Sequence, residues 1–155
     1  MGPAAGRCTT VMPMIEERDQ GAAIYTHRIR VRYGECDMQG VVFNPHYFAY
    51  VDDAMDTWLH AVLGDNYLGR FDYMVKKVSI EWFAPARVRD VIELRPAVAR
   101  WGRSSFDVTV RLERGSEPLA RADLVLISVT PDTHVPVPVP EEVRRALAPS
   151  GPAGR

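Results

Sequence analysis

The chain has 155 residues, of which 46% are apolar and 25% are charged, and its formal net charge is −1. This length and composition predict one globular domain with a substantial core. The nearly balanced charge gives no reason to expect binding to nucleic acid or to an anionic membrane, and no apolar run reaches the roughly eighteen residues of a membrane-spanning helix.

The N-terminal residues 1–21 contain glycine, proline and charge without hydrophobic periodicity. They lack the basic start and the continuous apolar stretch of a signal peptide, so we expect a disordered leader. The two cysteines, Cys8 and Cys36, are too few for a disulfide framework, and their spacing fits no zinc site. We therefore expect a protein of the reducing cytoplasm without a bound metal.

The folded part is expected to begin with a strand and a long helix. Residues 24–33 alternate in polarity, with Ile29, Val31 and Tyr33 on one side and arginines on the other, which is the period of a half-buried strand. After Pro45, apolar residues recur at steps of three and four until a glycine, which predicts one helix of about nineteen residues. Its apolar stripe is so wide that the helix must be largely enclosed, and a sheet is the simplest partner.

Four further strands are expected, over residues 73–85, 90–101, 104–114 and 117–131. The third alternates most regularly, because its apolar residues all face one way: Phe106, Val108, Val110 and Leu112. Turn-like connectors on either side of it predict that the last three strands form an antiparallel meander. The proline-rich residues 134–155 are expected to form a tail that could hold one short helix over 140–147.

This order of elements predicts an α+β fold. Residues 22–133 are expected to form one domain, in which a five-stranded antiparallel sheet curls around one long central helix. A doubly wound sheet is not expected, because four of the strands follow one another without helices between them.

The segment between the first strand and the helix carries the most specific pattern, GECDMQGVVFNPHYFAYVDDAM over residues 34–55. In it an acid, a cysteine and Asp37 precede Gly40, an apolar triplet and a helix start at a proline. This arrangement resembles the signature of hot-dog-fold acyl-CoA thioesterases, in particular the 4-hydroxybenzoyl-CoA thioesterase group. The later segments VKKVSIEWFAPARVRD and RWGRSSF resemble the second strand with its turn, and the third-to-fourth strand corner, of the same superfamily.

The resemblance covers about residues 24–131 and implies a hot-dog fold that assembles edge to edge into homodimers or homotetramers, with active sites at the subunit interface. It implies that Asp37 is the catalytic carboxylate and that the backbone N–H of Asn44 polarises the thioester carbonyl. Gly40 would let substrate and backbone approach closely. No cofactor is implied. The expected substrate is an acyl- or aroyl-CoA thioester, or an acyl group on a carrier protein, which shares the phosphopantetheine arm.

The residue chemistry fits such a reaction. A thioester loses its thiolate without strong acid assistance, but cleavage needs a nucleophile or base and a site for the oxyanion. The first-turn N–H groups of a helix lack helical acceptors and carry the positive end of the helix dipole, which suits an oxyanion. Asp37 could activate water as a general base or attack directly to give a mixed anhydride.

Further substrate contacts are expected from the start of the helix and from arginines at strand ends, which suit the phosphates of CoA. The residues expected to bind substrate are Val42, Phe43, His46, Tyr47, Arg87, Arg103 and Ser104. His46 could instead be an exposed polar residue of the first helical turn. Glu35 could orient Asp37 or face solvent, and Cys36 could be a nucleophile, although its acidic neighbours would not stabilise a thiolate.

Two other functions stay open from the sequence. One is an enoyl-thioester hydratase or dehydratase on the same fold, which would use His46 with an acid to move water across a carbon–carbon double bond. The other is a protein that binds acyl thioesters without cleaving them, because a fold alone does not establish activity.

Overall fold

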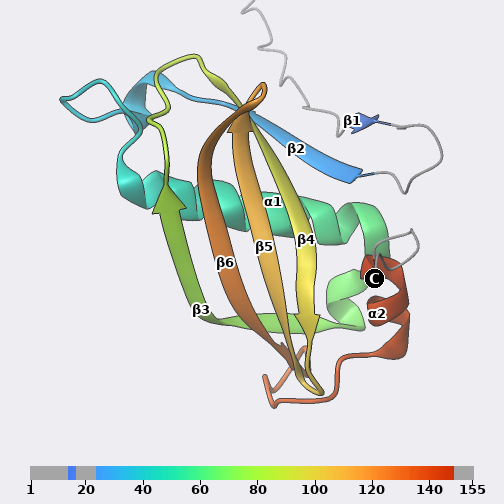
Figure 1. The fold of residues 1–155 in the computed structure, drawn as a ribbon. Coiled ribbons are helices and arrows are strands. Elements are labelled where there is room, and N and C mark those ends of the chain that lie inside the picture. The colour runs from blue at the N-terminus through green and yellow to red at the C-terminus, as the bar shows by residue number, and fades with distance from the viewer. Residues whose placement is uncertain (1–13, 17–23, 149–155) are drawn as a thin grey trace, which may run out of the picture.

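One long helix, α1 (Asn44–Leu63), lies against one face of an antiparallel sheet in the computed structural model (Figure 1). The structure describes residues 14–16 and 24–148. Most of the expected leader, residues 1–21, lies outside these ranges. Its described part is the short strand β1 (Met14–Glu16), which pairs with the start of β2 (Ile24–Arg30).

The main sheet contains β2 and four later strands, which are β3 (Asp72–Trp82), β4 (Val91–Trp101), β5 (Ser105–Arg114) and β6 (Glu117–Val129). Their order is β2-β4-β5-β6-β3, every neighbouring pair is antiparallel, and β1 extends the sheet beyond β2. The strands β4, β5 and β6 form the expected meander. A five-stranded antiparallel sheet around one central helix confirms the predicted α+β hot-dog architecture.

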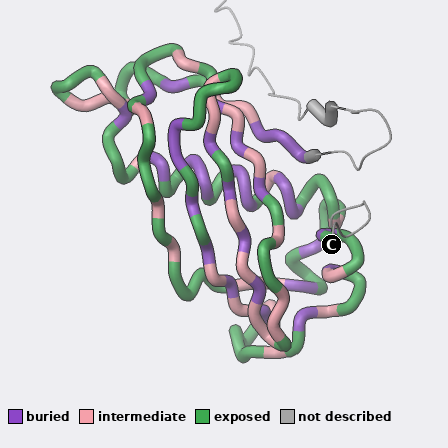
Figure 2. The backbone as a smooth tube through the Cα atoms, viewed as in Figure 1, coloured by how far each residue is buried: buried purple, intermediate pink, exposed green. Residues whose placement is uncertain are grey.

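The core lies between α1 and the sheet. Alternation along β5 predicts its buried face correctly, since Phe106 and Leu112 are fully buried and the residues between them alternate (Figure 2). On the helix, Ala54 and Leu59 are fully buried, while the aspartates of the polar side are exposed. Burying large apolar side chains of this kind contributes roughly 1.5–3 kcal/mol each relative to leaving them exposed.

The first strand is shorter than the alternation predicts. The pairing of β2 with β4 ends at Arg30, and Val31 then exchanges backbone hydrogen bonds of 2.9 Å with the loop before β4, at Arg89 and Asp90. The chain turns at once into the 3-10 helix η1 (Tyr33–Glu35), so Tyr33 is 88% exposed. The expectation that Tyr33 lies on the buried side with Val31 is therefore wrong.

The C-terminal part of the described chain packs against the end of α1. The short helix α2 (Glu141–Leu147) occupies the segment where the sequence predicts one, and Val143 and Leu147 are buried in the core. The Arg144 guanidinium lies 5.2 Å from the Trp101 ring centroid and donates to the carbonyl oxygens of Gly102 and Arg103. These contacts fasten the proline-rich segment to the β4–β5 turn.

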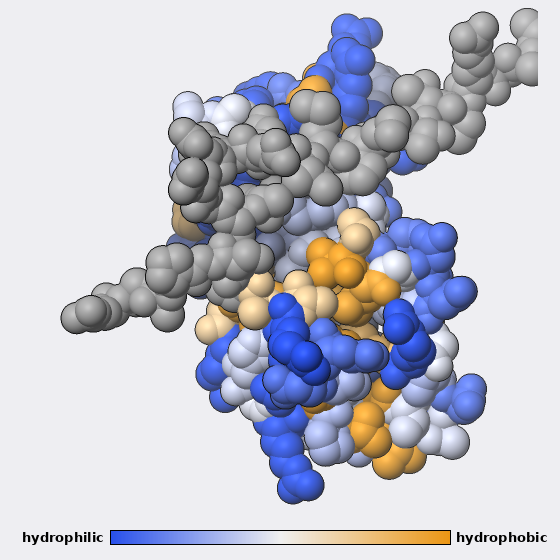
Figure 3. All heavy atoms as spheres, turned by 90° about the vertical axis from the view of Figure 1, so that its right-hand side faces the viewer, coloured by the Kyte–Doolittle hydropathy of each residue, from blue (hydrophilic) through white to orange (hydrophobic). Residues whose placement is uncertain are grey.

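On this face of the molecule apolar side chains gather among charged ones (Figure 3). A hollow of about 180 Å³ lies there between the end of α1, α2 and the segment that follows the second 3-10 helix, η2 (Tyr67–Gly69). No described helix is both long enough and apolar enough to cross a membrane.

Replacing Phe106 by alanine should lower the free energy of unfolding by about 3–5 kcal/mol, because the ring is fully buried and packs against Phe71 and Trp101. Denaturant titration followed by circular dichroism measures this change. Arg111→Ala, on the outward face of the same strand, should change the free energy by no more than about 0.5 kcal/mol. Equal effects of the two substitutions would contradict the assignment of the core.

Candidate active site

The loop between β2 and α1 folds back on itself and brings Asp37 close to the helix start. The Asp37 N–H donates to the Val41 carbonyl at 2.9 Å, and the Gly40 N–H donates to the Asp37 carbonyl at 2.9 Å. Cys36 and Val42 form an antiparallel bridge across the loop. Gly40 closes the turn with a φ of 75°, in the left-handed region that favours glycine.

The Asp37 carboxylate is partly exposed and only half engaged. Its Oδ1 accepts the Gln39 N–H at 2.8 Å. Its Oδ2 has no hydrogen-bond partner among residues 14–16 and 24–148. A carboxylate fixed through one oxygen can use the other as a base toward water or as a nucleophile.

The Asn44 N–H is a donor without an acceptor at the start of α1. The preceding N–H, of Phe43, donates to the Glu35 carbonyl at 2.9 Å, and the His46 N–H donates to the Phe43 carbonyl at 2.9 Å. Pro45 has no N–H. Within the described part of the chain no acceptor lies on the Asn44 N–H, and no side chain caps the helix, so this group can bind a negatively charged oxygen.

Four of the residues expected to bind substrate lie at or next to the Asp37 loop, and two of the four are buried. Val41 forms a bridge with Arg87, whose side chain is exposed, and the Val42 N–H donates to the Ala86 carbonyl at 2.8 Å. Val42 and Tyr47 are only 2% and 1% exposed, so they support the site from within the core. Phe43, by contrast, is exposed next to the Asn44 N–H.

Arg103 and Ser104 do not belong to this site within one chain. Arg87 precedes β4 and Arg103 follows it. The eleven residues of β4 separate the two arginines by about 33–36 Å, at 3.3 Å per residue. The structure therefore places Arg103 and Ser104 at the end of the sheet away from Asp37.

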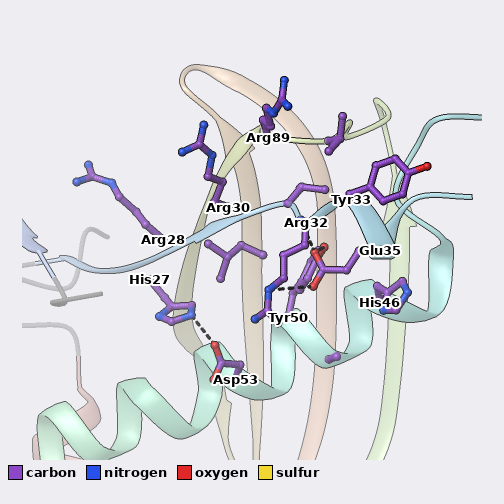
Figure 4. A pocket seen from close by; sticks show the side chains of 14 residues that line it. His27, Arg28, Arg30, Arg32, Tyr33, Glu35, His46, Tyr50, Asp53 and Arg89 are labelled. Carbon is purple, nitrogen blue, oxygen red and sulfur yellow. Dashed lines mark hydrogen bonds and ion pairs between the residues drawn. The ribbon is translucent and has the colours of Figure 1, made fainter. Parts of the chain in front are cut away.

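A large cavity lies on the β2 side of α1 (Figure 4). Its volume is about 970 Å³, and its lining includes His27, Glu35, His46, Tyr50 and Asp53, but neither Asp37 nor Asn44. His46 thus turns toward a different space from Asp37.

A second, smaller groove of about 310 Å³ lies between α1 and β3. Its lining is largely apolar and includes Phe48, Val51, Val75, Val78 and Leu124. Phe48 is one helical turn after Asn44, so this groove begins close to the free N–H.

The Glu35 side chain is held by hydrogen bonds within the protein, which differs from the sequence alternative of a side chain that only faces solvent, and among the described residues its carboxylate makes no hydrogen bond to Asp37. Its side chain is 17% exposed, and its Oε2 accepts the Tyr50 hydroxyl at 2.6 Å and the Arg32 N–H at 2.8 Å. Burial and the Glu35 carboxylate raise the pKa of Tyr50, which keeps the hydroxyl a donor. No local sequence pattern indicates this contact, because the partners are fifteen positions apart.

Among the residues that the structure describes, Cys36 has no basic side chain hydrogen-bonded to its thiol. Its Sγ lies 4.0 Å from the Arg32 carbonyl oxygen, an acceptor that suits a protonated thiol. Among the described residues, no three histidine, cysteine, aspartate or glutamate side chains are grouped as metal ligands would be.

The comparisons with known proteins agree on one family. The sequence model of the thioesterase-like superfamily matches residues 31–147. The acyl-CoA thioester hydrolase YbgC of Escherichia coli O6:H1 is 27% identical over 119 residues, which cover 74% of this chain and 89% of that protein.

Solved structures show the same fold. The PA5185 protein of Pseudomonas aeruginosa PAO1 is 31% identical, with a TM-score of 0.72, over 79% of this chain and 88% of that chain. Slr0204 of Synechocystis, a 1,4-dihydroxy-2-naphthoyl-CoA thioesterase, is 20% identical, with a TM-score of 0.68, over 79% of this chain and 93% of that chain. At that identity the second likeness concerns the fold alone.

Two glycines of the Asp37 loop should respond to alanine in opposite ways. Gly40→Ala should lower the free energy of unfolding by about 1 kcal/mol, since its φ of 75° is strained for any side chain. Gly34→Ala should be neutral or stabilising by a few tenths of a kcal/mol, because an added Cβ meets nothing within 4 Å and its φ is outside the left-handed region. Denaturant titration compares the two, and equal effects would contradict the turn geometry.

Proposed function

The chain belongs to the thioesterase-like superfamily and is a thioester hydrolase, and we propose that it cleaves acyl-CoA thioesters with Asp37 as the reacting carboxylate and the Asn44 N–H as the oxyanion donor. The observation that carries this proposal is that one Asp37 carboxylate oxygen and the Asn44 N–H both lack a partner among the described residues, and that only six residues separate Asp37 from Asn44. The Asn44 N–H lies at the positive end of α1.

In the proposed reaction the thioester carbonyl oxygen accepts the Asn44 N–H. Asp37 removes a proton from water as the water oxygen bonds to the carbonyl carbon, and the negative charge that develops on the carbonyl oxygen is stabilised by the N–H. The C–S bond then breaks, the leaving sulfur takes the proton held by Asp37 and departs as the thiol, and the acyl group is left as the carboxylic acid with Asp37 ionised again. Direct attack by Asp37 would give a mixed anhydride that water hydrolyses, and the same two groups serve that route.

The acyl group is proposed to lie in the groove between α1 and β3. The groove begins one helical turn after the oxyanion donor and is lined by apolar side chains, including Phe48 and Val78. This position would keep the reacting carbonyl at the helix start while the acyl chain lies along α1. The hydratase alternative has less support, since His46 lines a cavity that does not include Asp37.

We also propose that a second copy of the chain completes the site. β3 pairs with β6 on one side only within the described sheet, and its exposed apolar residues include Met74, Val75 and Trp82. Two β3 strands paired antiparallel around a two-fold axis would place the start of one beside the end of the other.

This pairing would also bring Arg103 and Ser104 of one chain to the Asp37 site of the other, which they cannot reach within a single chain. The start of β3 pairs with the end of β6, where the Ser128 N–H donates to the Ser104 carbonyl at 2.8 Å. The partner's Ser104 end would therefore approach this chain's Asp37 end. Arg87 of one chain and Arg103 of the other would then be available to the phosphates of CoA.

Asp37→Asn should lower kcat for the best acyl-CoA substrate by at least about 100-fold, because an amide is neither a base nor a nucleophile. Release of free thiol from purified protein measures the rate. Asp65→Asn, an exposed aspartate after the end of α1, serves as the control and should retain wild-type kcat. Near-complete activity of Asp37→Asn would reject the assigned carboxylate.

A panel of acyl-CoA, aroyl-CoA and acyl-carrier-protein thioesters should identify the substrate by the same assay. We expect thiol release from at least one CoA thioester, because the enzyme class requires it. Thermal stabilisation by ligands without turnover would indicate a binding protein instead. Loss of enoyl-CoA absorbance without thiol release would indicate the hydratase.

Met74→Asp should convert the dimer into monomers and lower activity, because the change places a charge at an exposed apolar position of the edge strand outside the proposed acyl groove. Sedimentation velocity measures the oligomeric state. Val91→Asp adds the same charge at an equally exposed position beside β2, at the other side of the sheet, and should leave the dimer intact. A monomeric but fully active wild-type protein would contradict the proposed assembly.

A further inference from the structure

We infer that Glu35 is a positioning residue, whose hydrogen bond from Tyr50 holds the Asp37 loop at a fixed place relative to α1. This inference rests on the proposed function, because it assumes that Asp37 and the Asn44 N–H act on one substrate. Glu35 itself faces the cavity on the β2 side of α1 and does not touch the substrate in this proposal.

The Glu35 side chain accepts two short hydrogen bonds at the same oxygen. Glu35 Oε2 accepts both the Tyr50 hydroxyl at 2.6 Å and the Arg32 N–H at 2.8 Å (Figure 4). The other oxygen, Oε1, lies 3.7 Å from Nε of the Arg32 side chain, which is 86% exposed. Both short hydrogen bonds are therefore accepted by Oε2. Oε1 contributes only a weak ion pair with the exposed Arg32 side chain.

The backbone of Glu35 fastens the other end of the same loop. Its carbonyl accepts the N–H of Phe43 at 2.9 Å. Phe43 directly precedes the proposed oxyanion donor, and Asp37 is two residues after Glu35. The Glu35 carbonyl thus connects the start of the loop to its end at Phe43. The Glu35 side chain connects the loop to Tyr50 in the second turn of α1.

Tyr50 is a suitable anchor because it cannot move easily. It is 7% exposed, and its ring packs edge-on against Tyr47 at 6.0 Å between centroids. Tyr47 packs in turn against Trp82 at the end of β3, with centroids 5.9 Å apart. Burial and the neighbouring carboxylate raise the pKa of Tyr50, so its hydroxyl stays protonated and can donate at neutral pH.

Loss of this contact should act on the chemical step more than on binding. Without the Tyr50 hydroxyl, the loop that carries Asp37 would be free to shift relative to the helix start. A misplacement of about 1 Å can lower a rate by about 100-fold when two groups must act on one atom. Arg87, which is expected to bind CoA, has a second attachment outside this loop, since its N–H donates to the Asp90 carboxylate at 2.8 Å.

The test is steady-state kinetics of thiol release with Tyr50→Phe, in the full chain and with the best acyl-CoA of the panel. We expect kcat to fall by about tenfold with KM changed less than about twofold. Glu35→Ala should lower kcat by at least as much. Tyr50→Phe added to Glu35→Ala should have little further effect, because the two changes remove the same contact.

Two further variants separate positioning from a general loss of stability. Glu35→Gln should recover most of the kcat lost in Glu35→Ala, because one amide oxygen can accept both hydrogen bonds. Tyr67→Phe is the matched control, since the Tyr67 hydroxyl donates to Asp56 at 2.9 Å near the far end of α1 and its ring is buried. It should lower the melting temperature as Tyr50→Phe does and leave kcat unchanged.

The inference is overturned if the wild type is active and Tyr50→Phe keeps kcat within twofold, as the Tyr67→Phe control does. It is also overturned if Glu35→Gln is as impaired as Glu35→Ala, because the charge and not the hydrogen bonds would then matter. Failure of the proposed function looks different, since the wild type would then release no thiol from any thioester, or Asp37→Asn would keep full activity.

Discussion

The burial of one side of α1 against the sheet is the constraint on which the rest of the structure depends. Tyr47, Val51 and Leu59 are buried on that side, whereas Phe48 and Val62 are exposed. The two ends of the helix are then the places where its backbone can meet solvent or a ligand. The C-terminal end is covered by α2 and η2, whereas the first turn, at Asn44, keeps an N–H without an acceptor among the described residues. The fold thus places the positive N-terminal end of α1 next to the loop that carries Asp37.

Most of the fold could be predicted because its signals are local. The step of three and four residues after Pro45 gave the helix, and the alternation from Phe106 to Leu112 gave the buried face of β5. The observed main strands begin and end within three residues of the predicted ones. Tyr33 was misplaced because the pattern was extended beyond the last paired residue, where backbone contacts with Arg89 and Asp90 turn the chain.

The site was predictable only in part, because some of its residues are neighbours in the sequence and others are far apart in it. The Asp37 loop and the helix start are contiguous in sequence, so the motif could indicate both. The hydrogen bond between Glu35 and Tyr50 depends on which turn of α1 the loop packs against. No local sequence pattern determines that position. Arg103 is expected at the site because arginines at strand ends suit the phosphates of CoA, but within one chain Arg103 and Ser104 follow β4 while Arg87 precedes it, so they lie at opposite ends of that strand.

The unsatisfied N–H of Asn44 links the assembly to the chemistry. In the open single chain water can satisfy this donor at little cost. A partner subunit that closed over it would remove that water, and a buried donor without an acceptor costs about 1–3 kcal/mol. A thioester carbonyl that enters the closed site removes this penalty, and it does so most strongly as negative charge develops on its oxygen. Closure would therefore favour the transition state over the empty site, provided that the contact between Glu35 and Tyr50 keeps Asp37 at the distance where attack can occur.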